Sequence, residues 1–315
     1  MMFRKKTFTD SIYKRILPSQ VIANVSGFVA MIIDSVLVAR FLGVSAVSAC
    51  GLITPLMVLL VAIAQMIYYG NQMICGTEIG KGDIKEANRV FSASLITMII
   101  VAVVCVALIM IFETPLCILL GAPGDSELLE LTKSYLNGYI IGAPGFMCLM
   151  ILPGVLQLDG DRATAVRAIV ILMISDVALD LINVLLIHGG LFGMGLATSL
   201  SNYIALFVMV LHFFKKDAMH VTIKNIGWKR MPEVIKRGTP QAIYSICRTV
   251  MTILLNRILL QFGSAIYVAA YSVISNIGNC IMSVGAGIGS ISLMVTGVAY
   301  GEEDRETLKD IVRAI

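Results

Sequence analysis

Charged residues divide the chain into apolar stretches that have the length of membrane-spanning helices. No charged residue occurs in residues 41–77, 90–112 or 134–158, and two longer stretches contain only two charges each. A helix needs about 20 apolar residues to cross a bilayer core, so the short stretches hold one span and the long ones hold two. The pattern predicts an all-α, polytopic membrane protein with about eight spanning helices, near residues 16–39, 46–70, 90–112, 134–156, 167–187, 192–214, 239–261 and 266–298.

Composition supports this reading and excludes several other classes. Of the 315 residues, 58% are hydrophobic and 14% are charged, whereas soluble domains carry about 25% charged residues. No P-loop, GxSxG motif, dinucleotide fingerprint or zinc-ligand spacing occurs, and the seven cysteines form no CxxC pair. We therefore expect no enzyme, cofactor, resident metal or nucleic-acid partner. The expected partners are the lipid bilayer and a small-molecule substrate, and the expected state is a monomer.

Lysine and arginine predict the orientation. Every second connection is basic, so that 20 of the 24 basic residues fall on one side of the predicted membrane. The positive-inside rule places that side in the cytoplasm. The apolar run at 16–39 is too long for a signal-peptide core and lacks a cleavage site, so it is read as a retained span. We expect a multi-pass protein of the cell membrane with a cytoplasmic N-terminus.

An internal repeat is visible in the sequence. The segment LPSQVIANVSGFVAMIIDSVLVARFLG from Leu17 is similar to TPQAIYSICRTVMTILLNRILLQFG from Thr239, with Asp34 opposite Asn256. The loop that starts at Ile79 likewise matches the loop that starts at Tyr300, at an offset of 221 residues. Six predicted spans separate the copies, which indicates parallel repeats.

The repeat predicts the domain organisation. Residues 1–214 form an N-lobe of six helices, and 215–238 form a basic cytoplasmic linker. Residues 239–315 form a partial C-lobe with two helices and the start of a cytoplasmic amphipathic segment. A six-plus-six protein needs roughly 130 more residues, so the chain is expected to be either a fragment or a natural truncation.

Three acids lie inside predicted spans. Asp34 is near the outer end of the first helix, and Asp176 and Asp180 are spaced i, i+4 on one face of the fifth. Charged residues are costly within a bilayer and normally face protein or water. Two carboxylates one turn apart repel when both are ionised, so this pair can take up a proton or bind a small cation. Alternatively, the acids only hydrogen-bond to neighbouring helices.

Two arginines lie in the seventh predicted helix. Arg257 is close enough to the outer end to reach the interface. Arg248 is nearer the middle, where it needs a carboxylate or a water-filled cavity.

Five segments together resemble the multidrug and toxic compound extrusion (MATE) family, namely 31–43, 76–90, 154–166, 176–201 and 238–263. The resemblance implies twelve helices in two lobes around a V-shaped cavity, of which this chain has the complete first lobe and the first two helices of the second. It also implies export of cationic or amphipathic compounds in exchange for protons or sodium.

The resemblance assigns residues as well. The family's first-helix acid matches Asp34, its fifth-helix partner matches Asp180, and a sixth-helix threonine matches Thr198. Asp176 replaces an amide and adds a charge, and Arg248 stands where another branch has a glutamate. The coupling site is therefore expected in the N-lobe, at Asp34, Asp180, Asp176 and Thr198, with sodium at the three acids as one alternative. Asn256 and Arg248 are expected to line the cavity.

The leading hypothesis is thus a secondary antiporter that exports drugs or toxic metabolites. Two alternatives stay open. The chain is a flippase for lipid-linked precursors, although such cavities are usually basic, or it is a truncated membrane protein that transports nothing. A membrane enzyme is disfavoured by the absent motifs.

Overall fold

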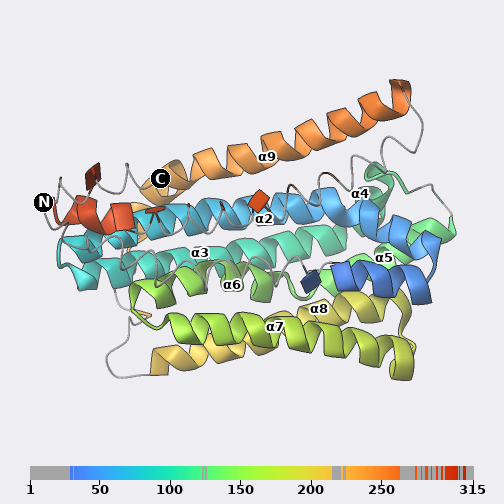
Figure 1. Ribbon diagram of the computed structural model, residues 1–315, viewed down its shortest axis with the longest axis horizontal. Coiled ribbons are helices and arrows are strands. Elements are labelled where there is room, and N and C mark those ends of the chain that lie inside the picture. Colours follow the sequence, from blue (N-terminus) through green and yellow to red (C-terminus); the bar gives the residue numbers. More distant parts are fainter. Residues whose placement is uncertain are drawn as a thin grey trace, which may run out of the picture.

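The structure, a computed structural model, is a bundle of long helices that run side by side (Figure 1). Every regular element in the described part of the chain is helical. The residues that the structure describes are 29–30, 32–122, 124, 126–214, 221–222, 225–262, 274, 278, 281–282, 285, 289, 292–293, 295–303, 305 and 308–309.

The helices alternate in direction, as the pattern of charges predicts. Residues 29–30 and 32–41 are helical and overlap the first predicted span, which they exceed by two residues; most of the eighth predicted span lies outside the described residues. The remaining elements are α2 (Val44–Gly80), α3 (Ile84–Ile111), α4 (Glu113–Leu119), α5 (Glu127–Ile140), α6 (Ala143–Leu158), α7 (Arg162–Ile182), the π-helix η1 (Asn183–Ile187), α8 (Gly190–Val210), the 3₁₀ helices η2 (Leu211–Phe214) and η3 (Trp228–Arg230), and α9 (Met231–Phe262).

Four of these helical stretches are long and apolar enough to cross a membrane: Val44–Gly80, Ile84–Ile111, 163–187 and 190–213. The pair formed by α5 and α6 makes a fifth if it is one bent span. Helix α9 is not among them, because Arg248, Arg257 and several polar residues interrupt its apolar sequence. The chain is therefore an all-α membrane protein.

The second and fourth predicted spans differ from the observed helices in length or in shape. Helix α2 ends at Gly80 instead of residue 70, and its 37 residues make it about 55 Å long, well beyond the bilayer core. Its last turns contain the buried polar residues Asn71, Gln72 and Glu78, which apolarity alone could not assign to a helix. The fourth span bends by 46° at the break between α5 and α6.

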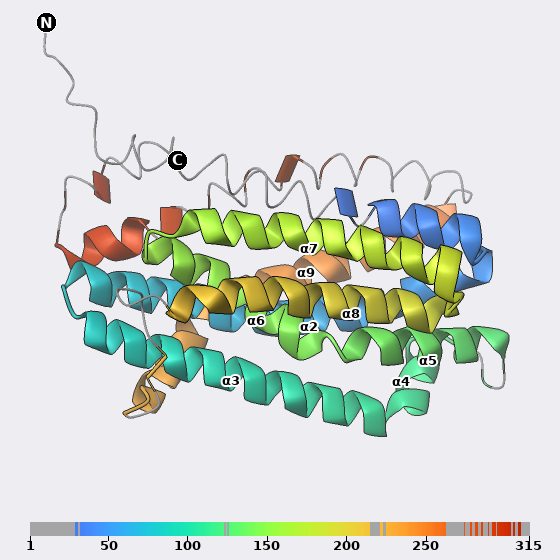
Figure 2. The ribbon, with the colours of Figure 1, turned by 90° about the horizontal axis from the view of Figure 1, so that it is seen from below.

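The turns at 81–83 and 159–161 lie at the same end of the bundle as η3 (Figures 1 and 2). We call this the basic end. Two of its turns are closed by aspartates that cap the next helix, since Asp83 accepts from the Glu86 amide at 3.0 Å and Asp161 from the Thr164 amide at 3.2 Å.

Helix α8 is tied to the basic end by a buried histidine. The His212 ring lies 2.7 Å from an oxygen of Asp159 and 2.8 Å from an oxygen of Asp161. This contact fixes the last turn after α8 against the α6–α7 turn, and so sets the position of α8 beside α7, where the candidate site lies.

Helix α9 begins at Met231, eight residues before the predicted span, and packs along α2. Near the basic end the two backbones touch, because a Cβ on Gly70 would overlap the Val234 carbonyl and one on Gly238 would overlap that of Met66. In Figure 1 the two helices diverge toward the Phe262 end of α9.

Candidate functional site

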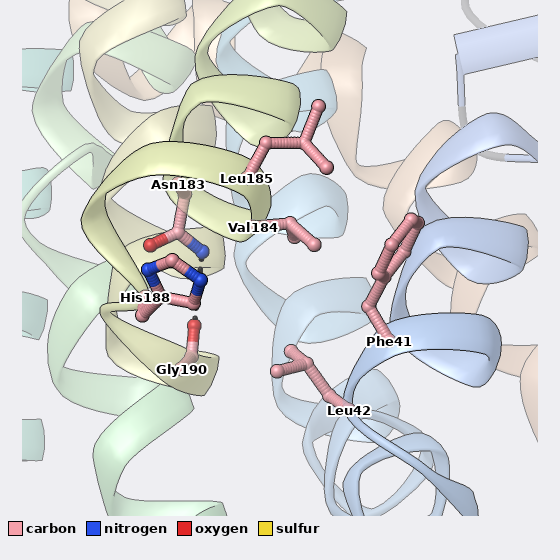
Figure 3. Close-up of a pocket in the computed structure, with 7 residues that line it drawn as sticks. All are labelled: Phe41, Leu42, Asn183, Val184, Leu185, His188 and Gly190. Atoms are coloured by element: carbon pink, nitrogen blue, oxygen red, sulfur yellow. Dashed lines mark hydrogen bonds between the residues drawn. The ribbon is translucent and has the colours of Figure 1, made fainter.

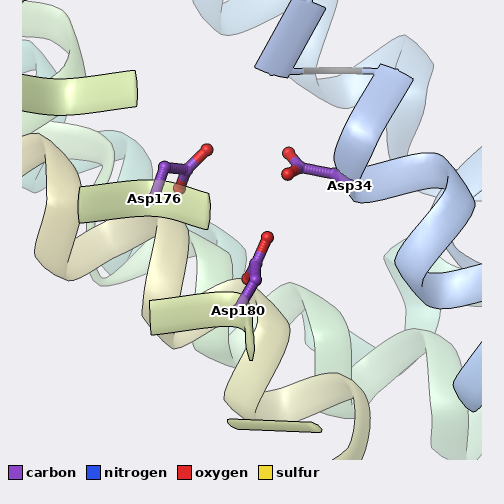
Figure 4. A group of neighbouring side chains, drawn as sticks. All are labelled: Asp34, Asp176 and Asp180. Carbon is purple, nitrogen blue, oxygen red and sulfur yellow. The ribbon is translucent and has the colours of Figure 1, made fainter. Parts of the chain in front are cut away.

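Three carboxylates meet between the first helical segment and α7. Asp34 lies on the helix at 32–41, and Asp176 and Asp180 lie one turn apart on α7. One oxygen from each carboxylate lies within 4.8 Å of the others, and the three side chains point toward one another (Figure 4). The i, i+4 spacing therefore does place both α7 acids on one face, and that face meets Asp34.

The group is largely removed from solvent. Asp180 is 1% exposed, Asp176 is 6% exposed and Asp34 is half-buried. Among the described residues, no donor group reaches either oxygen of Asp180 or the Oδ1 atom of Asp34. The side-chain partner of Asp180 is the Asp34 carboxyl itself, and two carboxyl groups can hydrogen-bond to each other only when one of them holds a proton.

Charge repulsion makes the fully ionised state of this group costly. Two like charges about 4 Å apart repel by about 4 kcal/mol at the effective dielectric of a protein surface, and by more where water is excluded. A single proton or cation among the three carboxylates removes most of this cost. Carboxylate oxygens are also ligands that hard cations prefer, so the residues present fit sodium as well as a proton.

Asp176 is hydrogen-bonded to a buried hydroxyl. The Ser201 hydroxyl, fully buried on α8, lies 2.9 Å from Asp176 Oδ1 and 2.8 Å from the Thr198 carbonyl oxygen. A hydroxyl has one proton to donate and two lone pairs. When Asp176 is ionised, Ser201 donates to it; when Asp176 is protonated, the acid donates to Ser201, which then donates to the Thr198 carbonyl.

Helix α5 supplies the third side of the site. Tyr135 interacts electrostatically with Asp34 and Asp180, and Tyr139 interacts with Asp176. The two rings lie 6.2 Å apart and are half-buried. Among the described residues, the groups near the three acids thus include hydroxyls from α5 and α8 and the Cys50 thiol from α2.

The other residues singled out from the sequence fall into two groups. Thr198 lies on α8 close to Asp176, and its own hydroxyl is 3.4 Å from the Met194 carbonyl oxygen. Arg248 lies on α9 with an exposed side chain. The side chain of Asn256 lies outside the described residues.

Ser201 was missed at the level of sequence, although a signal was present. It is three residues after Thr198 and therefore on the same face of α8. A serine in an apolar helix is unremarkable by itself. Only the packing of α7 against α8 shows that its hydroxyl reaches a carboxylate.

Comparisons of this chain with known proteins agree on one family. The family model described as MatE matches residues 20–182, more than half of the chain. The probable multidrug resistance protein YoeA of Bacillus subtilis is 21% identical over 302 residues, covering 93% of this chain and 65% of that protein. The multidrug export protein MepA of Staphylococcus saprophyticus is 24% identical over 237 residues, covering 74% and 52%. The chain thus spans less than two thirds of these relatives.

Solved structures share the fold. A crystal structure of MATE in complex with MaD3S superposes with a TM-score of 0.86 at 23% identity, covering 95% of this chain and 68% of that one. An outward-facing conformation of a multidrug resistance MATE family transporter of the MOP superfamily gives a TM-score of 0.83 at 23% identity, covering 95% and 67%.

Proposed function

The chain belongs to the MatE family, and from that premise we propose that it is part or all of a secondary antiporter that exports cationic or amphipathic small molecules in exchange for protons or sodium. Its relatives are named as multidrug export and multidrug resistance proteins. The proposed setting is the cell membrane with a cytoplasmic N-terminus and the basic end inside. The protein would work as a monomer and without a cofactor.

The observation that carries this proposal is the state of Asp180. It is 1% exposed, it faces two other acids, and among the described residues no donor group reaches its oxygens, so that its side-chain partner is the Asp34 carboxyl. A carboxyl group in this position is stable when it binds a cation in its ionised form or when it takes up a proton and becomes neutral. The site therefore binds the coupling ion strongly in one state and releases it at a cost, which the ion gradient supplies.

The three acids have different roles in this proposal. Asp34 and Asp180 come from different helices, so an ion shared between them ties the first helical segment to α7. Loss of that ion lets their charges repel and favours separation of the two helices. Asp176 is held by Ser201 and adds a third charge to the same space. Binding and release of the ion are in this way coupled to helix movement, as alternating access requires.

Efflux of ethidium, a planar cationic dye, from energised cells or proteoliposomes tests the proposal. Asp34→Asn and Asp180→Asn should each abolish gradient-driven efflux while the protein stays in the membrane at normal abundance. The matched control is Glu130→Gln, because the Glu130 side chain is 74% exposed and far from the site in the sequence. Full efflux from the Asp180→Asn protein would refute the proposed coupling site.

The choice of ion is settled in the same assay. A proton-coupled protein should drive efflux from a pH gradient in sodium-free buffer, whereas a sodium-coupled protein should need a sodium gradient. Efflux that requires neither gradient would contradict antiport altogether.

A further inference from the structure

A pocket opens beside the three carboxylates, at the end of the bundle opposite the basic end. It has a volume of about 340 Å³ and reaches the surface, since Phe41 is 46% exposed and Leu185 is 55% exposed. Figure 3 shows the end of the first helical segment on one side and η1 on the other. The pocket is lined by Phe41, Leu42, Asn183, Val184, Leu185, His188 and Gly190.

The pocket lining is about one helical turn from Asp180, at Val184, and about two turns from Asp34, at Phe41. Val38 follows Asp34 by four residues, and Val184 follows Asp180 by four. Residues spaced i, i+4 stack along one face of a helix. The two helices thus present the same order, which is a carboxylate, then a valine, then the pocket.

The two valines lie in an apolar layer. Val38 is 4% exposed and Val184 is 8% exposed, and both belong to one cluster of buried apolar residues, together with Ala46, Ala49, Leu191 and Met194. An ion that crosses such a layer without water or a polar partner loses its hydration, which costs several kcal/mol even after the protein relaxes. A single layer is enough to hold an ion back, and a small movement of either helix is enough to open it.

The pocket wall combines the polar residues Asn183 and His188 with apolar side chains. Asn183 donates to the Gly190 carbonyl at 3.0 Å and accepts from the Gly189 amide at 3.2 Å. This fixes the turn in which His188 adopts a left-handed conformation with φ 55°. At about 30 Å³ per water molecule, the volume holds a hydrated small cation with its first shell.

We propose that this pocket is the outer vestibule for the coupling ion, and that Val38 and Val184 form the closure between the vestibule and the three carboxylates. The inference rests on the proposed function, because it assigns an entry route to the same coupling site. The occupant is a hydrated monovalent cation or a water chain that carries a proton. A metal cation exchanges its water ligands for carboxylate oxygens, whereas for a proton one O–H bond breaks on the last water of the chain as one O–H bond forms on a carboxylate.

Threonine has the shape of valine and adds one hydroxyl, so it tests the closure with little change in packing. We compare the Val38→Thr/Val184→Thr protein with wild type in proteoliposomes, without export substrate, and apply first a pH gradient and then a sodium gradient. The gradient of the coupling ion should collapse several-fold faster in the double variant. The control is Val36→Thr, since Val36 lies on the same helix but is 55% exposed, and it should behave as wild type.

Adding Asp180→Asn to the double variant separates the closure from the coupling site. If the vestibule leads to the carboxylates, this third change should return the leak to the wild-type rate. A double variant that leaks no faster than Val36→Thr would overturn the inference, and so would a fast leak that survives Asp180→Asn. Failure of the proposed function would appear in a separate measurement. In that case the Asp180→Asn protein, with both valines unchanged, would still export the dye.

Discussion

Gly80 and Gly301 lie against each other at the basic end, although 221 residues separate them in the sequence. A Cβ on Gly80 would approach the Gly301 Cα to 3.0 Å and would overlap the Val298 carbonyl, and a Cβ on Gly301 would overlap the Thr77 carbonyl. In the predicted internal repeat the two glycines occupy equivalent positions. Equivalent residues meet where they lie next to the axis that relates two copies, so the contact is the one expected where two such repeats join.

Gly80→Ala should therefore separate the repeats at the basic end. The added methyl group cannot be accommodated by a side-chain shift, because the atoms that it meets belong to the backbone. We expect a cysteine at Thr77, which is 7% exposed, to react several-fold faster with a maleimide in the Gly80→Ala protein than in wild type. All native cysteines are first replaced.

The matched control for this prediction is Gly51→Ala. Gly51 also lies in α2, and a Cβ there would meet no atom within 4 Å. Its labelling rate should equal that of wild type. If Gly80→Ala and Gly51→Ala gave equal labelling rates, the contact between Gly80 and Gly301 would not require a glycine at position 80.

Arg230 joins three helices at the same end, and its network should weaken in acid. Its guanidinium lies 3.3 Å from Glu78 on α2, 3.5 Å from Glu86 on α3 and 2.8 Å from Glu233 on α9. Burial alone would raise the pKa of Glu233, but the hydrogen bonds from Arg237 and Arg230 outweigh it and hold this pKa below its ordinary value of 4.5.

A depressed pKa in the folded state stabilises the protein above the unfolded pKa, and that stabilisation is lost as the pH falls through the folded one. The melting temperature in detergent should thus fall as the pH drops below about 4.5. Arg230→Gln should lower the melting temperature by a few degrees at pH 7 and should make it less sensitive to acid, because Glu233 then keeps only Arg237. An Arg230→Gln protein with the wild-type acid profile would contradict this account.

The apolar pattern predicted the membrane class and the alternation of helices well, because both follow from the length and charge of each segment. It failed where helices leave the bilayer or bend. The end of α2 contains Asn71, Gln72 and Glu78, whose burial depends on tertiary partners such as Arg230. The bend between α5 and α6 lies at Ile141 and Gly142, and no charge marks it.

The candidate site was partly predictable for the same reason. A charge within an apolar segment is conspicuous, so Asp34, Asp176 and Asp180 could be named from the sequence. Their meeting point depends on the packing of the first helical segment against α7, which periodicity does not encode. The hydroxyl of Ser201 and the valines at 38 and 184 could not be named, because serine and valine are ordinary residues in spanning helices.

Ser201→Ala should change the pH dependence of efflux rather than abolish efflux. Without this hydroxyl both forms of Asp176 lose a hydrogen bond, but the bond to the ionised form is the stronger one, at about 1.5–3 kcal/mol against about 0.5–1.5 kcal/mol for a neutral pair, so the site holds a proton more tightly. Release becomes harder at a given pH, and we expect the pH optimum of dye efflux to move to a more alkaline value with a lower maximal rate. The measurement is the initial rate of ethidium efflux from proteoliposomes across a series of matched internal and external pH values.

The control for Ser201→Ala lies two residues away on the same helix. Ser199 is 1% exposed, and its hydroxyl donates to the Gly138 carbonyl on α5 at 2.7 Å, so Ser199→Ala removes a buried serine hydroxyl that contacts no carboxylate. It should lower stability without moving the pH optimum. If both variants moved the optimum equally, the effect would come from α8 packing. If only Ser201→Ala moved it, Asp176 takes part in ion exchange, because a carboxylate with a purely structural role would change stability and leave the pH profile in place.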